Sequence, residues 1–245
     1  FITVLRDAVD KYGFTRPSKG LTELDRHLFD FGLGHPLGTD MMHETKGNIP
    51  TPAYYEKIYG KDWRSTYMMF IGIGQGEIQL SALQIANLAA VIANRGYYYV
   101  PHLIKGFKNK EMEIPEQFRE KHMSGVDAKF FKPVIDGMDA AVASKWCGWS
   151  TPIPGITLCG KTGTSQNPPY RDHAVFMAFA PKDNPKIAIA VLIENAGFGA
   201  QSAAPIASLI VEKYLRGYIE APFRKEREKE MTRLNLLGPP KLDKK

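Results

Sequence analysis

The sequence predicts an α/β (α+β) fold in which an antiparallel sheet is flanked by helices. Three short runs that are apolar or rich in β-forming residues lie late in the chain, at residues 155–165, 173–180 and 186–194. Residues 181–185, Pro-Lys-Asp-Asn-Pro, form a turn-favouring string that indicates a hairpin between the last two runs. Apolar residues recur at helical spacing on both sides of these runs, so we expect helices to cover the sheet.

The best-defined helix is expected at residues 81–93. It begins with the capping-box pattern Ser81-Ala82-Leu83-Gln84 and ends at Asn94-Arg95-Gly96. Apolar periodicity predicts further helices at residues 1–12, 21–31, 127–144 and 205–215, with Asp127 as a cap and Pro205 in a first turn. Residues 32–69 are rich in Gly, Pro and small polar residues and are expected to form a long loop.

The net charge of +6 is concentrated at the C-terminus. Residues 224–245 hold eight Lys and Arg and four Asp and Glu, a balance of +4, which leaves +2 for the preceding 223 residues. No basic face with interleaved aromatic residues remains, so a nucleic-acid partner is not expected. We predict one domain over residues 1–220 and a charged, flexible tail over residues 221–245.

Neither a membrane span nor a signal peptide can be read from the sequence, because no apolar stretch approaches about 18 residues. The chain opens on Phe1 inside an expected helix, which indicates an excerpt from a longer protein. Cys147 and Cys159 have the spacing of neither a zinc site nor a redox pair. Two free cysteines are therefore favoured over the alternative, a disulfide.

One run on an expected strand offers chemistry for an anionic, peptide-like ligand: Gly160-Lys161-Thr162-Gly163-Thr164. It supplies an ammonium, two hydroxyls and a glycine that permits close backbone approach. Strand alternation places Lys161 and Thr162 on opposite faces, so one ligand can use both only along an open strand edge. That arrangement is peptide recognition by strand addition. A Lys-Thr-Gly triplet is also frequent by chance, so a purely structural role is the alternative.

Other motifs favour structural interpretations. The run Gly72-Ile73-Gly74-Gln75-Gly76 matches neither the dinucleotide fingerprint nor the P-loop. His173 beside Asp172 is interpreted as structural pairing at the start of a strand rather than as a catalytic base.

With the Lys-Thr-Gly run and the other motifs together, the chain resembles the class B penicillin-binding proteins, specifically the elongation-type penicillin-binding protein 2 group. Lys161-Thr162-Gly163-Thr164 is similar to the third signature of the penicillin-recognising serine enzymes. Other short motifs follow in that family's order over residues 1–215: Gly72-Ile73-Gly74-Gln75-Gly76, Leu83-Gln84, Asn94-Arg95-Gly96, Val100-Pro101-His102-Leu103, Gly137-Met138, Ile153-Pro154-Gly155-Ile156, Asp172-His173-Ala174-Val175-Phe176 and Phe179-Ala180-Pro181.

The resemblance implies a penicillin-binding protein transpeptidase, or β-lactamase-like, fold, present here only in its C-terminal part. It implies that Lys161, Thr162 and Thr164 bind the terminal carboxylate of an acyl-D-Ala-D-Ala stem peptide or of a β-lactam. It makes Lys161 and Thr164 catalytic residues, with the Thr164 N–H in the oxyanion hole, and it gives Gly163 the role of keeping the strand flat for substrate.

The chain departs from the family in one decisive respect. The family's nucleophile lies in a Ser-x-x-Lys motif, and no serine of this sequence has a lysine three residues later. Ser165-Gln166-Asn167 has the Ser-x-Asn spacing of the second signature but overlaps the strand motif, so it is interpreted as a chance match. Lys145-Trp146-Cys147-Gly148-Trp149 stands where relatives have Gly-Thr-Ala, which leaves the role of that loop open.

The implied activity is that of a peptidoglycan D,D-transpeptidase, whose serine lies in a longer parent protein. No metal and no organic cofactor is implied. The resemblance places the parent in the inner membrane through an upstream anchor, with a periplasmic catalytic domain and membrane proteins of the elongation machinery as partners. A D,D-carboxypeptidase and a non-catalytic, β-lactam-sensing or structural module are the alternatives.

Overall fold

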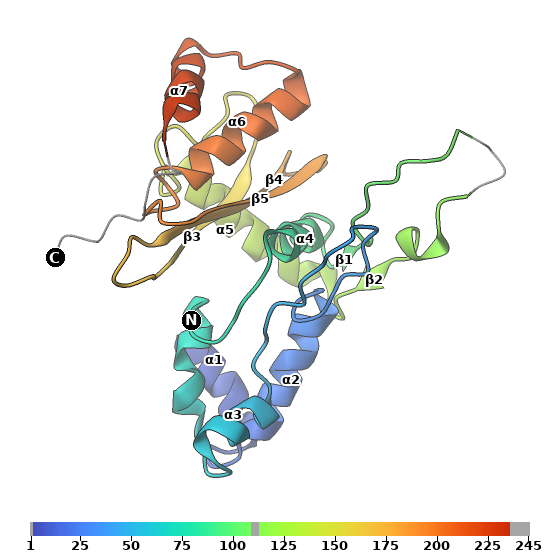
Figure 1. Cartoon of the computed structure of the whole chain (residues 1–245), viewed down its shortest axis with the longest axis vertical. Coiled ribbons are helices and arrows are strands. Elements are labelled where there is room, and N and C mark those ends of the chain that lie inside the picture. The colour runs from blue at the N-terminus through green and yellow to red at the C-terminus, as the bar shows by residue number, and fades with distance from the viewer. Residues whose placement is uncertain (1, 109–112, 236–245) are drawn as a thin grey trace. The chain divides into compact units, whose positions relative to one another are not determined.

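The computed structural model describes residues 2–108 and 113–235, and these form two compact units (Figure 1). Of the described residues, 2–84, 98–108 and 113–125 belong to unit 1, and 85–97 and 126–235 belong to unit 2. Among the described residues, every helix is too short or too polar to cross a lipid bilayer. The end of the predicted tail, residues 236–245, lies outside the described residues.

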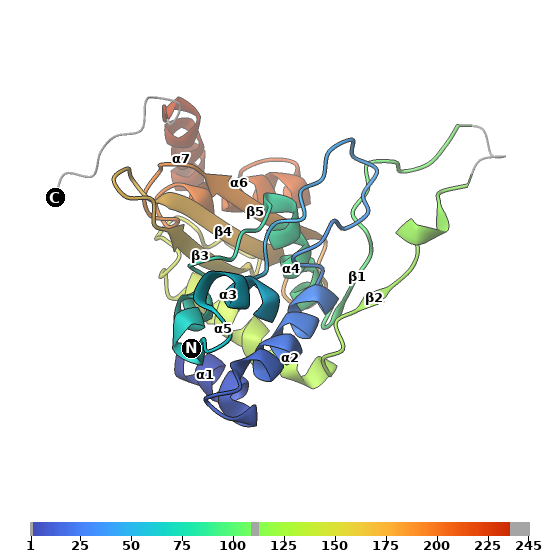
Figure 2. The same ribbon diagram turned by 60° about the horizontal axis from the view of Figure 1, so that its bottom comes forward.

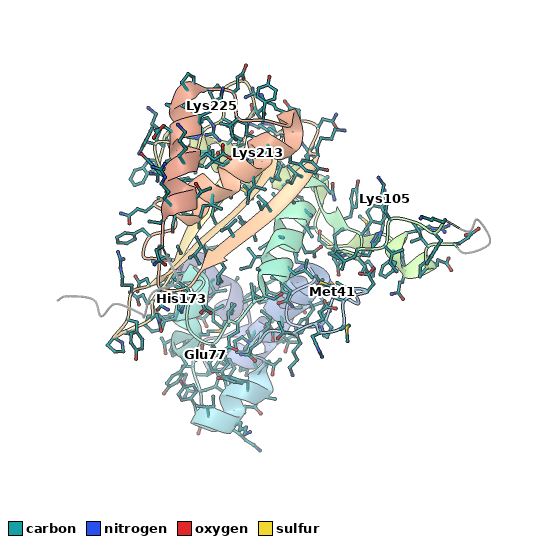
Figure 3. The ribbon with its side chains drawn as sticks, turned by 45° about the horizontal axis from the view of Figure 1, so that its top comes forward. Met41, Glu77, Lys105, His173, Lys213 and Lys225 are labelled. Atoms are coloured by element: carbon teal, nitrogen blue, oxygen red, sulfur yellow. The ribbon has the colours of Figure 1, made fainter. Side chains whose placement is uncertain are left out.

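Unit 1 is largely helical. Its elements are α1 (Ile2–Val9), the 3-10 turn η1 (Asp10–Tyr12), α2 (Pro17–Asp30), α3 (Pro52–Tyr59) and η2 (Ser65–Ile73). The core contains the buried side chains of Val9, Leu21, Tyr55, Trp63 and Met68. The Tyr55 hydroxyl donates to Glu77 Oε2 at 3.1 Å; Glu77 is labelled in Figure 3.

The expected long loop over residues 32–69 is wrong in part, because α3 and the start of η2 lie within it. Pro52 occupies the first turn of α3, and the Thr51 hydroxyl accepts a hydrogen bond from Tyr54 N–H at 3.4 Å. A capping threonine followed by proline is a helix-start signal. Here the many neighbouring glycines and prolines obscured it.

The capping box predicted at Ser81 is confirmed at the start of α4 (Ala82–Ala93). Gln84 N–H donates to Ser81 Oγ at 3.1 Å, and Ser81 N–H donates to Gln84 Oε1 at 3.0 Å. The Gln84 amide is buried and also donates to the carbonyls of His35 and Lys46, each at 3.0 Å. The capping residue therefore also holds both ends of the irregular segment 35–46.

A second irregular segment joins two very short strands that were not expected. β1 (Tyr97–Tyr98) pairs with β2 (His122–Met123), and the 3-10 turn η3 (Glu116–Phe118) lies between them in the chain. The Asp40 carboxylate accepts hydrogen bonds from the N–H groups of Leu103 and Ile104 at 2.9 to 3.0 Å. Two-residue strands have too little periodicity to be read from sequence.

Unit 2 contains an antiparallel sheet in the order β3 (Cys159–Ser165), β4 (His173–Ala180) and β5 (Ile187–Ile193). The three predicted strands are thus confirmed, except that the first begins at Cys159 rather than at Gly155. The sheet lies between α6 (Ala203–Arg216) on one side and α5 (Phe131–Ala143) on the other (Figures 1 and 2). The short turn η4 (Ala128–Phe130) precedes α5, and Asp127 caps it as predicted.

Small side chains let α6 pack closely on the sheet. Phe176 and Ala178 of β4 are fully buried in one cluster with alanines of α6, among them Ala203, Ala204 and Ala207. Burying apolar surface at about 25 cal/mol per Å² makes this cluster a main source of the stability of unit 2. Both cysteines are buried and free, as favoured from the sequence.

A buried arginine attaches the last helix, α7 (Pro222–Arg233). Arg224 and its ion-pair partner Glu212 on α6 are both fully buried, and Arg224 Nε donates to Glu212 Oε2. Arg224 Nη1 donates to the carbonyls of Ser150 at 2.7 Å and Pro152 at 2.9 Å, and Nη2 donates to Ser208 Oγ at 2.8 Å. The predicted flexible tail is therefore wrong for residues 222–233.

The Glu212 carboxylate is saturated with donors besides Arg224. Arg216 Nη1 and Glu220 N–H each donate to Oε1 at 3.0 Å. Burial by itself raises the pKa of Glu212, but the hydrogen bonds from Glu220 and Arg224 and the arginine charge outweigh it and hold the pKa below its ordinary value. Glu212 is thus ionised in the folded protein. Its contribution to stability is present above the unfolded-state pKa and is lost as pH falls through the lower folded-state pKa.

The Arg224→Ala variant is expected to lower the free energy of unfolding by about 3–5 kcal/mol, because the buried Glu212 carboxylate loses its main partner. The control is Lys225→Ala, which removes an exposed cation from the next position of the same helix (Figure 3). That control is expected to change the free energy of unfolding by less than about 0.5 kcal/mol. Urea denaturation measures the free energy of unfolding of both variants. Equally small decreases in the two variants would show that contacts other than those of Arg224 hold α7.

Candidate active site

The predicted ligand-binding run lies on β3, at the edge of the described sheet. β3 pairs only with β4, from Cys159 opposite Phe179 to Ser165 opposite His173. No other strand of residues 2–108 or 113–235 pairs with the far edge of β3. The open edge expected from the sequence is therefore confirmed, and it leaves room for a peptide to add as a further strand.

Lys161 is exposed on this edge strand, and no acidic side chain of the described residues forms an ion pair with it. Its Nζ donates to the carbonyl of the adjacent Thr162 at 2.6 Å. None of the salt bridges found within the described part of the chain includes Lys161. An ammonium that holds only a carbonyl can exchange this contact for a carboxylate, which makes a stronger, charge-assisted hydrogen bond.

Thr162 and Gly160 face the core side of the sheet. Thr162 lies opposite Phe176 and Gly160 lies opposite Ala178. A Cβ at Gly160 would lie 2.4 Å from Cζ of Phe176, so the phenylalanine ring occupies the space that a side chain would need. Gly160 thus allows β3 to pack directly on the buried ring, immediately before Lys161.

A loop at residues 197–200, far from β3 in the sequence, packs against this strand, and the sequence interpretation did not include it. A Cβ at Gly199 would lie 2.8 Å from the carbonyl oxygen of Gly163 and 2.4 Å from that of Val175, so the backbone of this loop touches the sheet directly. A Cβ at Gly148 would lie 2.5 Å from the Ala200 carbonyl oxygen. The Gly-Phe-Gly string at residues 197–199 was the only sequence signal of this close packing.

His173, labelled in Figure 3, begins β4 and has a structural role, as interpreted from the sequence. Its Nδ1 accepts a hydrogen bond from Asn195 N–H at 3.0 Å. The Asn195 side chain in turn accepts from Asn167 Nδ2 at 2.8 Å, and Asn167 N–H donates to Asp172 Oδ1 at 3.3 Å. These bonds join the β3–β4 connection to the segment after β5. Asn167, the last residue of the Ser-Gln-Asn string, thus has hydrogen-bond partners within this connection.

The part of the chain that the structure describes contains no candidate metal centre. No three or more His, Cys, Asp or Glu side chains gather there in a way that could hold an ion. What the strand offers is an exposed ammonium and an open edge. An ammonium can pair with a carboxylate, and an open strand edge can pair with an extended peptide.

The comparison with protein families agrees with this geometry. Residues 17–212 match the penicillin binding protein transpeptidase domain. Because this match covers more than half of the chain, the chain belongs to the penicillin-binding protein transpeptidase family.

Within the family, the chain is similar to penicillin-binding protein 2. It is 31% identical over 218 residues to the peptidoglycan D,D-transpeptidase MrdA of Haemophilus influenzae, which covers 80% of this chain and 33% of that protein. The crystal structure of Pseudomonas aeruginosa PBP2 in complex with WCK 5153 matches with a TM-score of 0.70 and 29% identity, over 90% of this chain and 49% of the other.

A complex between PBP2 and MreC from Helicobacter pylori is also similar. Its PBP2 matches with a TM-score of 0.65 and 26% identity, over 88% of this chain and 40% of the other. The chain spans about a third of the length of the curated relative described above.

The Gly199→Ala variant is expected to destabilise unit 2 by about 1–3 kcal/mol, because the new methyl group overlaps the backbone of β3 and β4. Amide hydrogen exchange at Thr162 and Gly163 should also become faster. The control Gly137→Ala lies on α5, where an added Cβ meets nothing within 4 Å, and should stabilise the helix by about 0.5–1 kcal/mol. Unchanged exchange in β3 of Gly199→Ala would contradict the direct contact.

Proposed function

We propose that this chain supplies the Lys-Thr-Gly-Thr wall of the active site in a peptidoglycan D,D-transpeptidase. The observation that carries the proposal is Lys161, an exposed ammonium that pairs with no carboxylate of the described residues and lies on an edge strand of a penicillin-binding protein transpeptidase domain. A stem peptide ending in D-Ala-D-Ala is short, extended and anionic at its end. It therefore matches both the open edge and the charge.

In the proposed complex, the substrate adds alongside β3 with its terminal carboxylate near Lys161, Thr162 and Thr164. Gly163 lies between the two threonines and has no side chain to hold the peptide away from the strand. The Thr164 N–H donates to the oxygen of the reacting carbonyl as that oxygen gains negative charge. Such a donor typically accounts for about 10²–10³ in rate.

The proposed reaction has two steps. A serine hydroxyl attacks the carbonyl of the penultimate D-alanine, an ester to the serine forms, and the peptide C–N bond breaks to release D-alanine. The amine of a neighbouring stem peptide then attacks the ester, forms the cross-linking amide and returns the serine. No Ser-x-x-Lys occurs among the 245 residues, so we infer that the serine is contributed by a longer polypeptide that includes this chain.

The proposal extends to partners and location. β-Lactams would acylate the same serine with their carboxylate against Lys161, in keeping with the family's name. The solved complex of a similar PBP2 with MreC supports membrane proteins of the elongation machinery as partners. We accordingly place the domain in the periplasm, on a protein anchored in the inner membrane.

Lys161→Ala in the full-length protein is expected to lower the rate constant for β-lactam acylation about 10- to 100-fold, because a charge-assisted hydrogen bond to the carboxylate is lost. The melting temperature should not change, since Lys161 contacts solvent and its own strand. Lys186→Ala removes an exposed lysine near the start of β5 in the same sheet and should acylate normally. A drop in melting temperature with unchanged acylation would instead make Lys161 structural.

The 245-residue chain by itself is expected not to be labelled by a fluorescent penicillin, whereas the full-length protein is. Acylation needs a serine activated by an adjacent base, and the sequence contains no serine one helical turn before a lysine. Gel labelling of both proteins, with boiled samples as controls, measures the difference. Labelling of the short chain that excess penicillin abolishes would identify another nucleophile, with Ser165 as the first residue to test.

A further inference from the structure

We propose that Arg171 is a specificity-determining residue of the substrate site: its guanidinium binds a second carboxylate of the stem peptide, carried by the residue before D-Ala-D-Ala. This inference rests on the proposed function, because it adds a contact to the peptide that we place along β3. The terminal carboxylate remains assigned to Lys161. Arg171 lies in the connection between β3 and β4, two residues before β4 begins.

Arg171 is a partly buried cation without an anion. It forms neither an ion pair nor a hydrogen bond with any residue that the structure describes. The partly or fully buried arginines of α6 and α7 differ in this respect, since Arg216, Arg224 and Arg227 each form an ion pair with a glutamate. A guanidinium carries five N–H donors in a planar fork that matches a carboxylate. Arg171 can therefore bind a ligand without first breaking an ion pair to a described residue.

The backbone around Arg171 is fixed by hydrogen bonds. Tyr170 N–H donates to the Asn167 carbonyl at 2.8 Å, and Gly197 N–H donates to the Asp172 carbonyl at 2.8 Å. Asn167 N–H also donates to Asp172 Oδ1 at 3.3 Å, so the carboxylate next to Arg171 in the sequence is bound to the main chain. The guanidinium therefore extends from a connection with a defined conformation.

The guanidinium lies against the loop that also touches β3. A Cβ at Gly197 would lie 3.5 Å from Arg171 Nη2, so the guanidinium packs beside this glycine. A Cβ at Gly199 would lie 2.8 Å from the Gly163 carbonyl oxygen and 3.4 Å from Cβ of Thr162. The two residues from Gly197 to Gly199 span at most about 7 Å. One short loop therefore contacts both Arg171 and the part of β3 that is proposed to bind the substrate.

The direction of the proposed peptide leads toward Arg171. With its terminal carboxylate near Lys161 and its reacting carbonyl near Thr164 N–H, the earlier residues of the peptide continue past Thr164 toward the end of β3. Ala174 lies opposite Thr164 in the sheet. Arg171 precedes Ala174 by three residues, which span at most about 10 Å. Side chains as long as those of arginine and glutamate bridge such a distance.

A purely structural role is the alternative for Arg171. In that role its methylene groups would pack beside Gly197 and the charge would be irrelevant. Such packing does not depend on the charge of a bound peptide. Selectivity between an acidic and a neutral peptide therefore separates recognition from packing.

The experiment uses the full-length protein and two synthetic peptides that end in D-Ala-D-Ala and carry either Glu or Gln at the preceding residue. Each peptide competes with a fluorescent penicillin, and the decrease in the acylation rate constant gives its inhibition constant. The wild type is expected to bind the Glu peptide about 3- to 20-fold more tightly, the effect of one partly exposed, charge-assisted contact. In Arg171→Met, which keeps a long apolar side chain, this ratio should fall to about 1.

Two lysine variants serve as controls. Lys161→Ala should weaken both peptides equally and keep their ratio, because both peptides carry the terminal carboxylate. Lys186→Ala removes an exposed lysine near the start of β5 and should leave both inhibition constants unchanged. In Arg171→Glu the preference should reverse, so that a peptide with Lys at the same position binds more tightly than the Glu peptide.

A wild type that binds the Glu and Gln peptides equally, or binds neither, overturns the inference. A preference for the Glu peptide that survives in Arg171→Met does the same. If penicillin acylates the wild type and Lys161→Ala is impaired, these results refute the role of Arg171 alone. A wild type that penicillin does not acylate refutes the proposed function as well.

Discussion

The buried ion pair between Arg224 and Glu212 is the interaction on which the arrangement of unit 2 depends. Two charges without access to water are stable only when their hydrogen-bonding capacity is met, and here the partners come from separate parts of the chain. Arg224 joins α7 to α6 through Glu212 and Ser208. It also holds the carbonyls of Ser150 and Pro152, in the segment that leads from α5 to β3. Loss of the Arg224 side chain would remove its hydrogen bonds to Glu212, Ser208, Ser150 and Pro152 together.

The hydrogen bonds of Arg224 also support the candidate site, because they fix the segment between α5 and β3. Ser150 and Pro152 follow directly on the turn that contains Cys147, and Ser208 Oγ donates to the Thr151 carbonyl at 2.6 Å. Thr151 in turn fixes the carbonyl of Cys147 at 2.7 Å. A continuous series of hydrogen bonds therefore runs from the buried Arg224 to Cys147, whose sulfur contacts the Gly160 carbonyl of β3 at 3.9 Å. The strand that carries Lys161 is thus attached to a hydrogen-bonded part of the interior of unit 2, which favours a preorganised edge.

Sequence reasoning found the elements with strong local signals. The capping box at Ser81 and the three strands of unit 2 were predicted close to their observed bounds, because periodicity and caps are local properties. It missed α3, where loop-like composition surrounded a short helix, and α7, where alternating Lys, Arg and Glu resembled a solvated tail. Helix α7 carries little apolar signal because one buried arginine, not an apolar face, attaches it.

For the candidate site, the sequence by itself determined the chemical groups: Lys161, Thr162, Gly163 and Thr164 were identified from their order, and the expected family was confirmed by the match over residues 17–212. The sequence also predicted an open edge for this strand, but only the tertiary structure decided that Cys147 and Gly199 contact it. The physical reason is distance along the chain. A motif on one strand has a local pattern, whereas contacts from residues 15 positions before and 37 positions after Thr162 exist only once the sheet and its helices have come together.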